Sequence, residues 1–454
     1  MANLKEYKLG NIANIVVSNV DKKTTPNQKT VKLCNFVDVY YNWAITKSNY
    51  DSFMTATASD EEISKFSLKK GQVAFTKDSE TRDDIGIPAY IAEDFKDVVL
   101  GYHTALATPD ENIVTGEYLN AFMHSSYIQK YFELNATGSG MRYTLSQQTL
   151  HDIPILAPDL DAQHKIGSLL SKIDRKISIN REINRNLEEL AKQIYDYWFV
   201  QFDFPNEEGK PYKSSGGKMV WNDVLKREIP DGWEVKKIED FCRIFTGKKD
   251  VNQSLDFGKY KFFSCAPGYR FSNEKLYEGK AILISGNGSY TGRTIFVNDA
   301  FDLYQRTYAV VLKTDNTDCL EYIFYTAKRF LSLKVGGGTH GSAIPYIVYD
   351  DIAKECFPFC EIAIEKFQKL IVQILSRISR IEKEILELSN LRDNLLPLLM
   401  NGQVTLNSCL SAHGILLFVK FTIWEVKEYV TWMLKCRYYK VFNHNFVNLW
   451  TMNR

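Results

Sequence analysis

The sequence lacks features that define several large classes of proteins. It contains 8 cysteines but no CxxC pair, and no histidine stands at zinc-like spacing from a cysteine pair. Its net charge is only +1, so the chain as a whole does not attract a polyanion. The most apolar run, residues 415–419, is interrupted by Lys420 and is far shorter than the about 20 residues of a membrane span. We therefore expect a cytoplasmic protein with free thiols and no metal, in which any nucleic-acid surface is a local patch.

Short catalytic motifs are missing as well. The sequence has no NPPF-type or DPPY-type motif of adenine methylation and no glycine fingerprint for S-adenosylmethionine. Residues 286–294 resemble a phosphate-binding loop, but the glycine spacing is wrong and Arg293 stands where lysine is required. Asp231, Glu234 and Lys236 are too close in sequence to come from the separate strands of a metal-dependent nuclease. We expect no catalytic site and no cofactor in this chain.

The chain contains an internal repeat. Gln163 begins a segment that recurs from Gln368, at a constant offset of 205 residues. Upstream, residues 8–12 resemble residues 237–241. Each half therefore opens with a short segment containing leucine or isoleucine, continues through a region rich in strands, and closes with a long helix.

The two closing helices show a heptad pattern. Steps of four and three residues from Ile166 to Trp198 meet apolar residues at eight of ten positions, and the same steps from Phe367 to Leu399 do so at nine of ten. A 3.5-residue repeat held this long is typical of a coiled-coil seam, although packing on the helix's own domain is the alternative. Asn180 and Asn184 lie in the seam, where they either fix the register or face a polar partner.

The regions before the helices combine short strands and helices. Runs such as 98–108, 281–285 and 307–312 are rich in β-branched and aromatic residues, and residues 117–131 and 320–333 are expected to be helical. Residues 201–230 contain the prolines, glycines and serines of an extended linker. The sequence predicts an α+β protein with two mixed α/β domains, joined by two long helices that form an antiparallel coiled coil, in a pseudo-two-fold repeat.

Two long motifs carry a resemblance to a known family. Residues 194–233 contain Trp198-Phe199, then Gly-Lys-Pro-Tyr, Ser-Ser-Gly-Gly and Ile-Pro-Asp-Gly-Trp. Residues 391–402 run Leu-Arg-Asp-Asn-Leu-Leu-Pro-Leu-Leu-Met-Asn-Gly. Over residues 1 to about 405, the chain resembles the DNA-specificity subunit of type I restriction–modification systems.

The resemblance implies an organisation and a function. Residues 1–158 and 231–360 would be two target-recognition domains, each binding one half of a split asymmetric DNA site. The helices at 159–200 and 361–402, the first followed by the linker 201–230, would set the half-site spacing and dock two methyltransferase subunits. Translocase–nuclease subunits would complete the assembly, with S-adenosylmethionine, ATP and magnesium bound by the partners. The resemblance ends near Val404, and we assign no role to residues 403–454.

Polar clusters late in each domain are the candidate DNA contacts, because hydroxyls and amides suit phosphates while arginine, glutamine, asparagine and histidine suit base edges. Each of them alone could equally be an ordinary surface residue. The candidates are Lys77, Arg82, Ser139, Arg142, Tyr143, Thr144, Gln147, Asn287, Ser289, Arg293, Arg306, Thr339, His340 and Ser342.

An aromatic group at the end of the first long helix is the candidate partner-docking surface. It comprises Tyr195, Tyr197, Trp198 and Phe199, and packing under the adjacent domain is the alternative. Two other functions stay open for the whole chain. It could be a stand-alone DNA-modifying or DNA-cleaving enzyme, which the missing motifs disfavour, or a coiled-coil scaffold that does not bind DNA.

Overall fold

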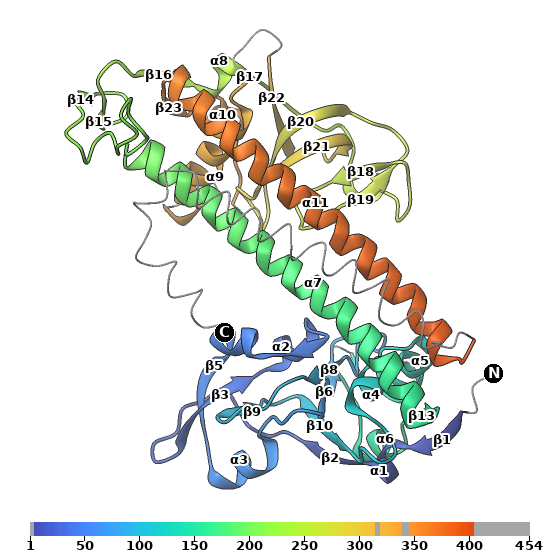
Figure 1. Cartoon of the computed structure of the whole chain (residues 1–454). Helices are drawn as coiled ribbons and strands as arrows, with labels where there is room; N and C mark the ends of the chain where they lie inside the picture. Colours follow the sequence, from blue (N-terminus) through green and yellow to red (C-terminus); the bar gives the residue numbers. More distant parts are fainter. Residues whose placement is uncertain (1–3, 141, 314–317, 338–344, 404–454) are drawn as a thin grey trace. The chain divides into compact units, whose positions relative to one another are not determined.

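The computed structural model describes residues 4–140, 142–313, 318–337 and 345–403. The chain divides into two compact units (Figure 1). Of the described residues, those within 4–181 and 382–403 form unit 1, and those within 182–381 form unit 2. Each unit therefore contains one mixed α/β region together with parts of both long helices.

Unit 1 is built around a five-stranded sheet of order β2-β10-β6-β8-β4. A second sheet, β5-β3-β9, a third, β11-β12-β7, and the antiparallel pair β1–β13 complete it. The strands are β1 (Lys5–Lys8), β2 (Ala13–Val17), β3 (Lys29–Cys34), β4 (Ala44–Ile45), β5 (Met54–Ala58), β6 (Val73–Thr76), β7 (Asp78–Ser79), β8 (Pro88–Ile91), β9 (Val98–Leu100), β10 (Thr104–Pro109), β11 (Thr137–Ser139), β12 (Arg142–Thr144) and β13 (Pro154–Ala157). The helices before the long one are α1 (Leu9–Ile12), α2 (Phe36–Tyr40), α3 (Asp60–Phe66), α4 (Gly116–Met123), α5 (Ser126–Asn135) and α6 (Gln147–His151).

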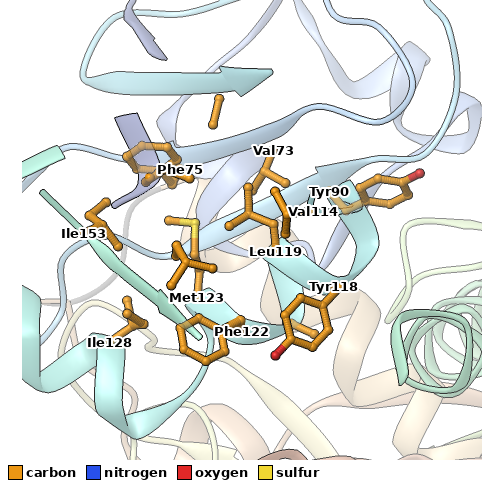
Figure 2. Close-up of a cluster of buried hydrophobic side chains, with 14 of the residues drawn as sticks. Val73, Phe75, Tyr90, Val114, Tyr118, Leu119, Phe122, Met123, Ile128 and Ile153 are labelled. Carbon is orange, nitrogen blue, oxygen red and sulfur yellow. The ribbon is translucent and has the colours of Figure 1, made fainter. Parts of the chain in front are cut away.

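One of two hydrophobic clusters described in unit 1 forms where α4 packs on the main sheet. Figure 2 shows Leu119, Phe122 and Met123 of α4 among side chains from β6 and from the segment before β13. The predicted strand 98–108 is in fact two strands, β9 and β10, which belong to different sheets. The predicted helix 117–131 is likewise two helices, because the first ends at Met123 and Ser125 accepts a hydrogen bond from the Ile128 amide as the N-cap of the second.

Unit 2 is built around a six-stranded sheet of order β17-β22-β20-β21-β18-β19. Helix α9 (Leu320–Gly337) packs against β20 and β21 (Figure 1). The strands are β14 (Met219–Asn222), β15 (Arg227–Pro230), β16 (Glu234–Lys237), β17 (Cys242–Thr246), β18 (Tyr260–Phe263), β19 (Arg270–Ser272), β20 (Tyr277–Ser285), β21 (Thr294–Leu303), β22 (Thr307–Leu312) and β23 (Cys356–Phe359). Two short helices, α8 (Ile238–Phe241) and α10 (Tyr349–Ala353), flank the sheet in sequence.

The two units share one topology, which confirms the internal repeat. The antiparallel order β2-β10-β6-β8 in unit 1 matches β17-β22-β20-β21 in unit 2. The pair β1–β13 with α1 matches the pair β16–β23 with α8, as the likeness of residues 8–12 to 237–241 predicted.

Buried hydrogen bonds repeat with the topology. Gln163 Oε1 accepts the Thr115 amide at 2.9 Å, and Gln368 Oε1 accepts the Tyr322 amide at 3.1 Å. Tyr118 donates its hydroxyl to the Leu156 carbonyl at 2.6 Å, and Tyr322 donates to the Pro358 carbonyl at 2.6 Å. The start of α7 is thus tied to Thr115, the N-cap of α4, and the start of α11 is tied to Tyr322 in the first turn of α9. The two tyrosines tie α4 to β13 and α9 to β23.

The long helices are α7 (Leu160–Tyr195) and α11 (Glu361–Met400), and they are antiparallel within each unit. In unit 1, Arg392 Nη1 lies 3.8 Å from Asp174 Oδ1, and Lys176 Nζ lies 3.4 Å from Glu384 Oε1. All ten predicted seam positions from Ile166 to Trp198 are buried, which confirms the coiled coil.

The two seam asparagines face the opposite helix. In unit 1, Asn180 Nδ2 donates to Glu384 Oε2 at 2.9 Å. In unit 2, Asn184 Nδ2 approaches the Ile378 carbonyl at 3.5 Å, while its Oδ1 is buried without a partner among the described residues. Asn180 therefore has a polar partner, whereas Asn184 costs stability in the manner of a register-fixing residue.

The segment 201–230 is more ordered than an extended linker. Helix α7 passes into a π-helical turn at Asp196–Val200, and β14 and β15 form a hairpin after it. Arg227 donates to the Val200 carbonyl at 2.6 Å and stacks over the buried ring of Phe202 at 4.4 Å. Proline and glycine content alone did not reveal these tertiary contacts. No helix in the described part of the chain is long and apolar enough to cross a membrane.

Candidate nucleic-acid interface

The first polar cluster lies at one end of the main sheet of unit 1. It comprises Lys77, Asp78, Arg82, His103, Arg142, Tyr143 and Thr144. The Lys77 amide donates to the His103 carbonyl at 2.9 Å, and the Leu145 amide donates to the Lys77 carbonyl at 3.0 Å. These bonds join the ends of β6 and β12 to the segment before β10. Most of the cluster's residues line a hollow of about 380 Å³.

Asp78 is the electrostatic centre of the first polar cluster. Its Oδ2 contacts His103 Nδ1 and lies 3.7 Å from Arg142 Nη2, and its Oδ1 lies 3.4 Å from Lys77 Nζ. Burial alone would raise the pKa of Asp78, but hydrogen bonds from Thr144 and His103 and the charge of Lys77 outweigh it and lower that pKa. The carboxylate is therefore ionised and neutralises part of the positive charge around it.

The remaining candidates of unit 1 lie on or near the same small sheet. Arg82 stacks over the Tyr143 ring at 5.0 Å. Ser139, on β11, and Gln147, at the start of α6, are exposed. The structure thus brings the first-half candidates to one region, although Lys77 points inward and donates to Thr144 Oγ1 at 2.8 Å.

The second polar cluster occupies the equivalent place in unit 2. It comprises Cys265, Asn287, Ser289, Arg293 and Arg306. The Gly286 amide donates to the Arg306 carbonyl at 3.0 Å, and the Ile347 amide donates to the Gly286 carbonyl at 2.8 Å. These two bonds correspond to those of Lys77 with His103 and Leu145.

The loop of the second polar cluster is the predicted glycine-rich turn between β20 and β21. A Cβ atom on Gly286 would lie 2.4 Å from the Arg306 carbonyl oxygen, so only glycine fits this close approach. Asn287 Oδ1 accepts from the Cys265 thiol at 3.2 Å, and Arg293 Nη1 donates to the Ala266 carbonyl at 3.2 Å. Ser289 and Arg306 are exposed. The predicted contacts Thr339, His340 and Ser342 lie outside the described residues.

Sequence reasoning missed three members of these clusters. Asp78 directly follows the predicted Lys77, so this pair of opposite charges after β6 could have indicated it from the sequence. His103 and Cys265 belong to no motif, and only the fold brings them to the clusters. Within the described residues, no group of three or more His, Cys, Asp and Glu side chains could hold a metal ion.

The family model of the type I restriction modification DNA specificity domain matches residues 1–189 and 230–389. The chain belongs to this family. The two matched stretches correspond to the two halves of the internal repeat, each with its own polar cluster.

Relatives with this description span most of the chain. The HindI specificity subunit of Haemophilus influenzae is 24% identical over 484 residues, covering 89% of this chain and 100% of that protein. The MjaIX specificity subunit of Methanocaldococcus jannaschii is 26% identical over 316 residues, covering 65% of this chain and 70% of that protein. A crystal structure of a type I system S subunit from M. genitalium has a TM-score of 0.56 at 15% identity, covers 88% of this chain and 96% of its own, and shows the same fold.

The aromatic group at the end of α7 lies mainly inside unit 2. Tyr195 and Phe199 are 5% and 1% exposed, and the Phe199 ring lies 4.5 Å from that of Tyr322. Because side chains packed in this way cannot reach another subunit, the packing alternative holds for these two residues. Trp198 is also buried, at 9% exposed, but it lines a surface hollow of about 460 Å³ with the exposed Ile362, and Tyr197 is half-buried. Only these two aromatic residues remain candidates for docking.

Proposed function

We propose that this chain is the DNA sequence-recognition subunit of a type I restriction–modification enzyme, in which each unit recognises one half of a split asymmetric site. The observation that carries the proposal is the repeated frame with unlike polar clusters. The same backbone hydrogen bonds fix both clusters, but charged side chains dominate the first and an amide and a thiol lie at the centre of the second.

This arrangement suits an asymmetric DNA site. Recognition of a base depends on which donors and acceptors face its edge, whereas the frame only has to hold them in place. Two copies of one frame with different side chains can therefore recognise two different half-sites. The net charge of +1 fits this function, because the contacts belong to local clusters.

The long helices supply the remaining roles in the proposal. Their antiparallel pairing would set the distance between the half-sites, and the hollow beside Trp198 would receive part of a methyltransferase subunit. Translocase–nuclease subunits would complete the cytoplasmic enzyme. S-adenosylmethionine, ATP and magnesium would bind to these partners, so the chain itself would be non-catalytic.

The central experiment measures DNA binding by the chain in complex with its methyltransferase subunits. We expect one split sequence to be preferred over unrelated DNA by roughly a thousandfold or more, with affinity falling steeply as salt rises. Binding without sequence preference would contradict recognition, and absence of salt-dependent binding would favour the coiled-coil scaffold. Cleavage or methylation by the isolated chain would favour the stand-alone enzyme.

The spacing role has its own test. One additional heptad in each of α7 and α11 keeps the seam in register and lengthens the helix pair by about 10 Å. This length corresponds to about three base pairs of DNA. We expect a series of spacers between fixed half-sites to show a longer optimum for the extended chain, with lower activity because one half-site is rotated around the duplex. An unchanged optimum in a folded variant would mean that the helices do not set the spacing.

A further inference from the structure

The first polar cluster contains a carboxylate in a position that a simple phosphate-binding surface would not need. Asp78 is 13% exposed and lies between Lys77 on one side and His103 and Arg142 on the other. The Arg142 side chain is 64% exposed. Asp78 therefore lies beside one terminal nitrogen, Nη2, of a guanidinium that is otherwise exposed to a ligand.

The proton positions follow from the chemistry of the three groups. Asp78 is ionised and only accepts hydrogen bonds, so His103 Nδ1 carries the hydrogen in their shared contact. Arg142 Nη2 lies 3.1 Å from the same Nδ1, but arginine cannot accept, so two donors meet there without a bond. Arg142 is consequently held by the charge of Asp78, and it has no partner for its other N–H groups within the described residues.

The backbone at His103 supports a dedicated role for this residue. Its φ is +69°, in the left-handed region that residues other than glycine rarely adopt. Its carbonyl accepts the hydrogen bond from the Lys77 amide, and its side chain contacts Asp78. Strained conformations of this kind persist where the surrounding structure fixes them, and they concentrate at functional sites. At the equivalent place in unit 2, Arg306 does not have a positive φ.

We propose that Arg142 recognises the major-groove edge of one guanine in the first half-site, and that Asp78 and His103 are the positioning residues that aim it. This inference rests on the proposed function. The guanine edge offers two acceptors, N7 and O6, which match the paired donors of a fixed guanidinium. A phosphate would also accept from Arg142, but the ionised Asp78 beside it would repel a second negative charge. A neutral base edge meets no such repulsion.

The roles of the other cations follow from their contacts. Lys77 is 22% exposed and donates to Thr144, so it serves to balance the charge of Asp78 rather than to contact DNA. Arg82 lies on the Tyr143 ring and has no carboxylate partner within the described residues, which makes it a matched control that contacts phosphate.

The test uses the chain in complex with its methyltransferase subunits and DNA in which each guanine of the first half-site is replaced in turn by 7-deazaguanine. This base lacks the N7 acceptor but still pairs with cytosine. We expect one replacement to weaken binding roughly tenfold. Arg142→Ala should weaken binding to normal DNA by a similar factor and abolish the effect of that replacement, and Arg142→Lys should reduce it.

Asp78→Asn separates positioning from a general structural effect. It should remove the discrimination between guanine and 7-deazaguanine while keeping or raising affinity for unrelated DNA, because a negative charge is lost. Arg82→Ala should weaken all sequences equally and leave the discrimination intact. In every variant the preference for the second half-site serves as the control for folding.

The outcomes distinguish this inference from the proposed function. If the parent complex shows no sequence preference at all, the proposed function fails. If it prefers one split site but Arg142→Ala weakens all sequences equally and lowers the salt slope by about one, Arg142 contacts phosphate and the inference is wrong. Unchanged sensitivity to 7-deazaguanine in Arg142→Ala or in Asp78→Asn would also overturn it.

Discussion

In unit 1 the Lys77 amide meets the His103 carbonyl at 2.9 Å, and in unit 2 the Gly286 amide meets the Arg306 carbonyl at 3.0 Å. One position further along the chain, unit 1 has the charged Asp78 and unit 2 has the neutral Asn287. The backbone frame is therefore repeated at a place where the side chains have diverged. Buried hydrogen bonds tolerate little change, whereas exposed positions can vary without loss of the fold.

The largest expected effect comes from exchanging the recognition domain of one unit, which tests whether the two units act independently. Replacing residues 1–158 by the first domain of another specificity subunit should redirect the first half-site and leave the second unchanged. Affinity for the original site should fall toward the non-specific level, roughly a thousandfold or more. The measurement is the methylation pattern of DNA exposed to the reconstituted enzyme. A change in both half-sites would show that the domains do not act independently.

A second prediction concerns the repeated frame itself. Gln163→Ala and Gln368→Ala should each lower the free energy of unfolding by about 2–3 kcal/mol. The first leaves the backbone amide of Thr115 without its acceptor, and the second leaves that of Tyr322 without its acceptor. Thermal or urea unfolding of the full chain measures both losses. The exposed Gln147 provides a matched control, because Gln147→Ala should change stability by less than about 0.5 kcal/mol. Unequal losses at the two framework positions would mean that only one copy of the tie stabilises its unit.

A third prediction concerns the titration of Asp174 in unit 1, because the equivalent position of the repeat in unit 2 has no titratable group. Burial raises the pKa of Asp174 to about 6, although Arg392 opposes this, while its counterpart Ser379 in the repeat is exposed and uncharged. Between about pH 4 and 6 the folded state holds a proton that the unfolded state has lost, so stability falls as pH rises through this window. Asp174→Asn should remove this fall, which is roughly 2 kcal/mol.

The titration of His124 should change how the stability of Asp174→Asn depends on pH. Burial lowers the pKa of His124 to about 3, with Arg392 acting in the same direction, so its contribution to stability is lost as pH falls below about 6.5. The two titrations oppose each other in the parent chain. Unfolding of Asp174→Asn at several pH values should therefore show a steeper loss in acid than the parent, and an unchanged profile would contradict the assignment.

Sequence patterns predicted the elements that periodicity governs, and much less of the clusters. The seam from Ile166 to Trp198 was recognisable because a heptad needs only local spacing. The polar cluster of Arg142 and Lys77 was predicted in outline, from polar residues late in the first domain and on nearby turns. Its centre was not, because His103 reaches Asp78 only through the pairing of β10 with β6. Periodicity also could not show that Tyr195 and Phe199 pack inside unit 2, since an aromatic helix end suits both packing and docking.

The smallest expected effect comes from making the second cluster resemble the first. Asn287→Asp places a carboxylate at the position equivalent to Asp78, but Gly286 stands where unit 1 has Lys77, so no neighbouring lysine balances the charge. The new charge should repel DNA and weaken binding by about 1 kcal/mol at low salt, and the loss should shrink as salt rises. Asn287→Ala is the matched control, because it removes the amide without adding charge and should leave the salt slope unchanged. A lysine at position 286 could not restore the balance, since its Cβ would lie 2.4 Å from the Arg306 carbonyl oxygen. Equal salt dependence for Asn287→Asp and Asn287→Ala would mean that this position does not face DNA.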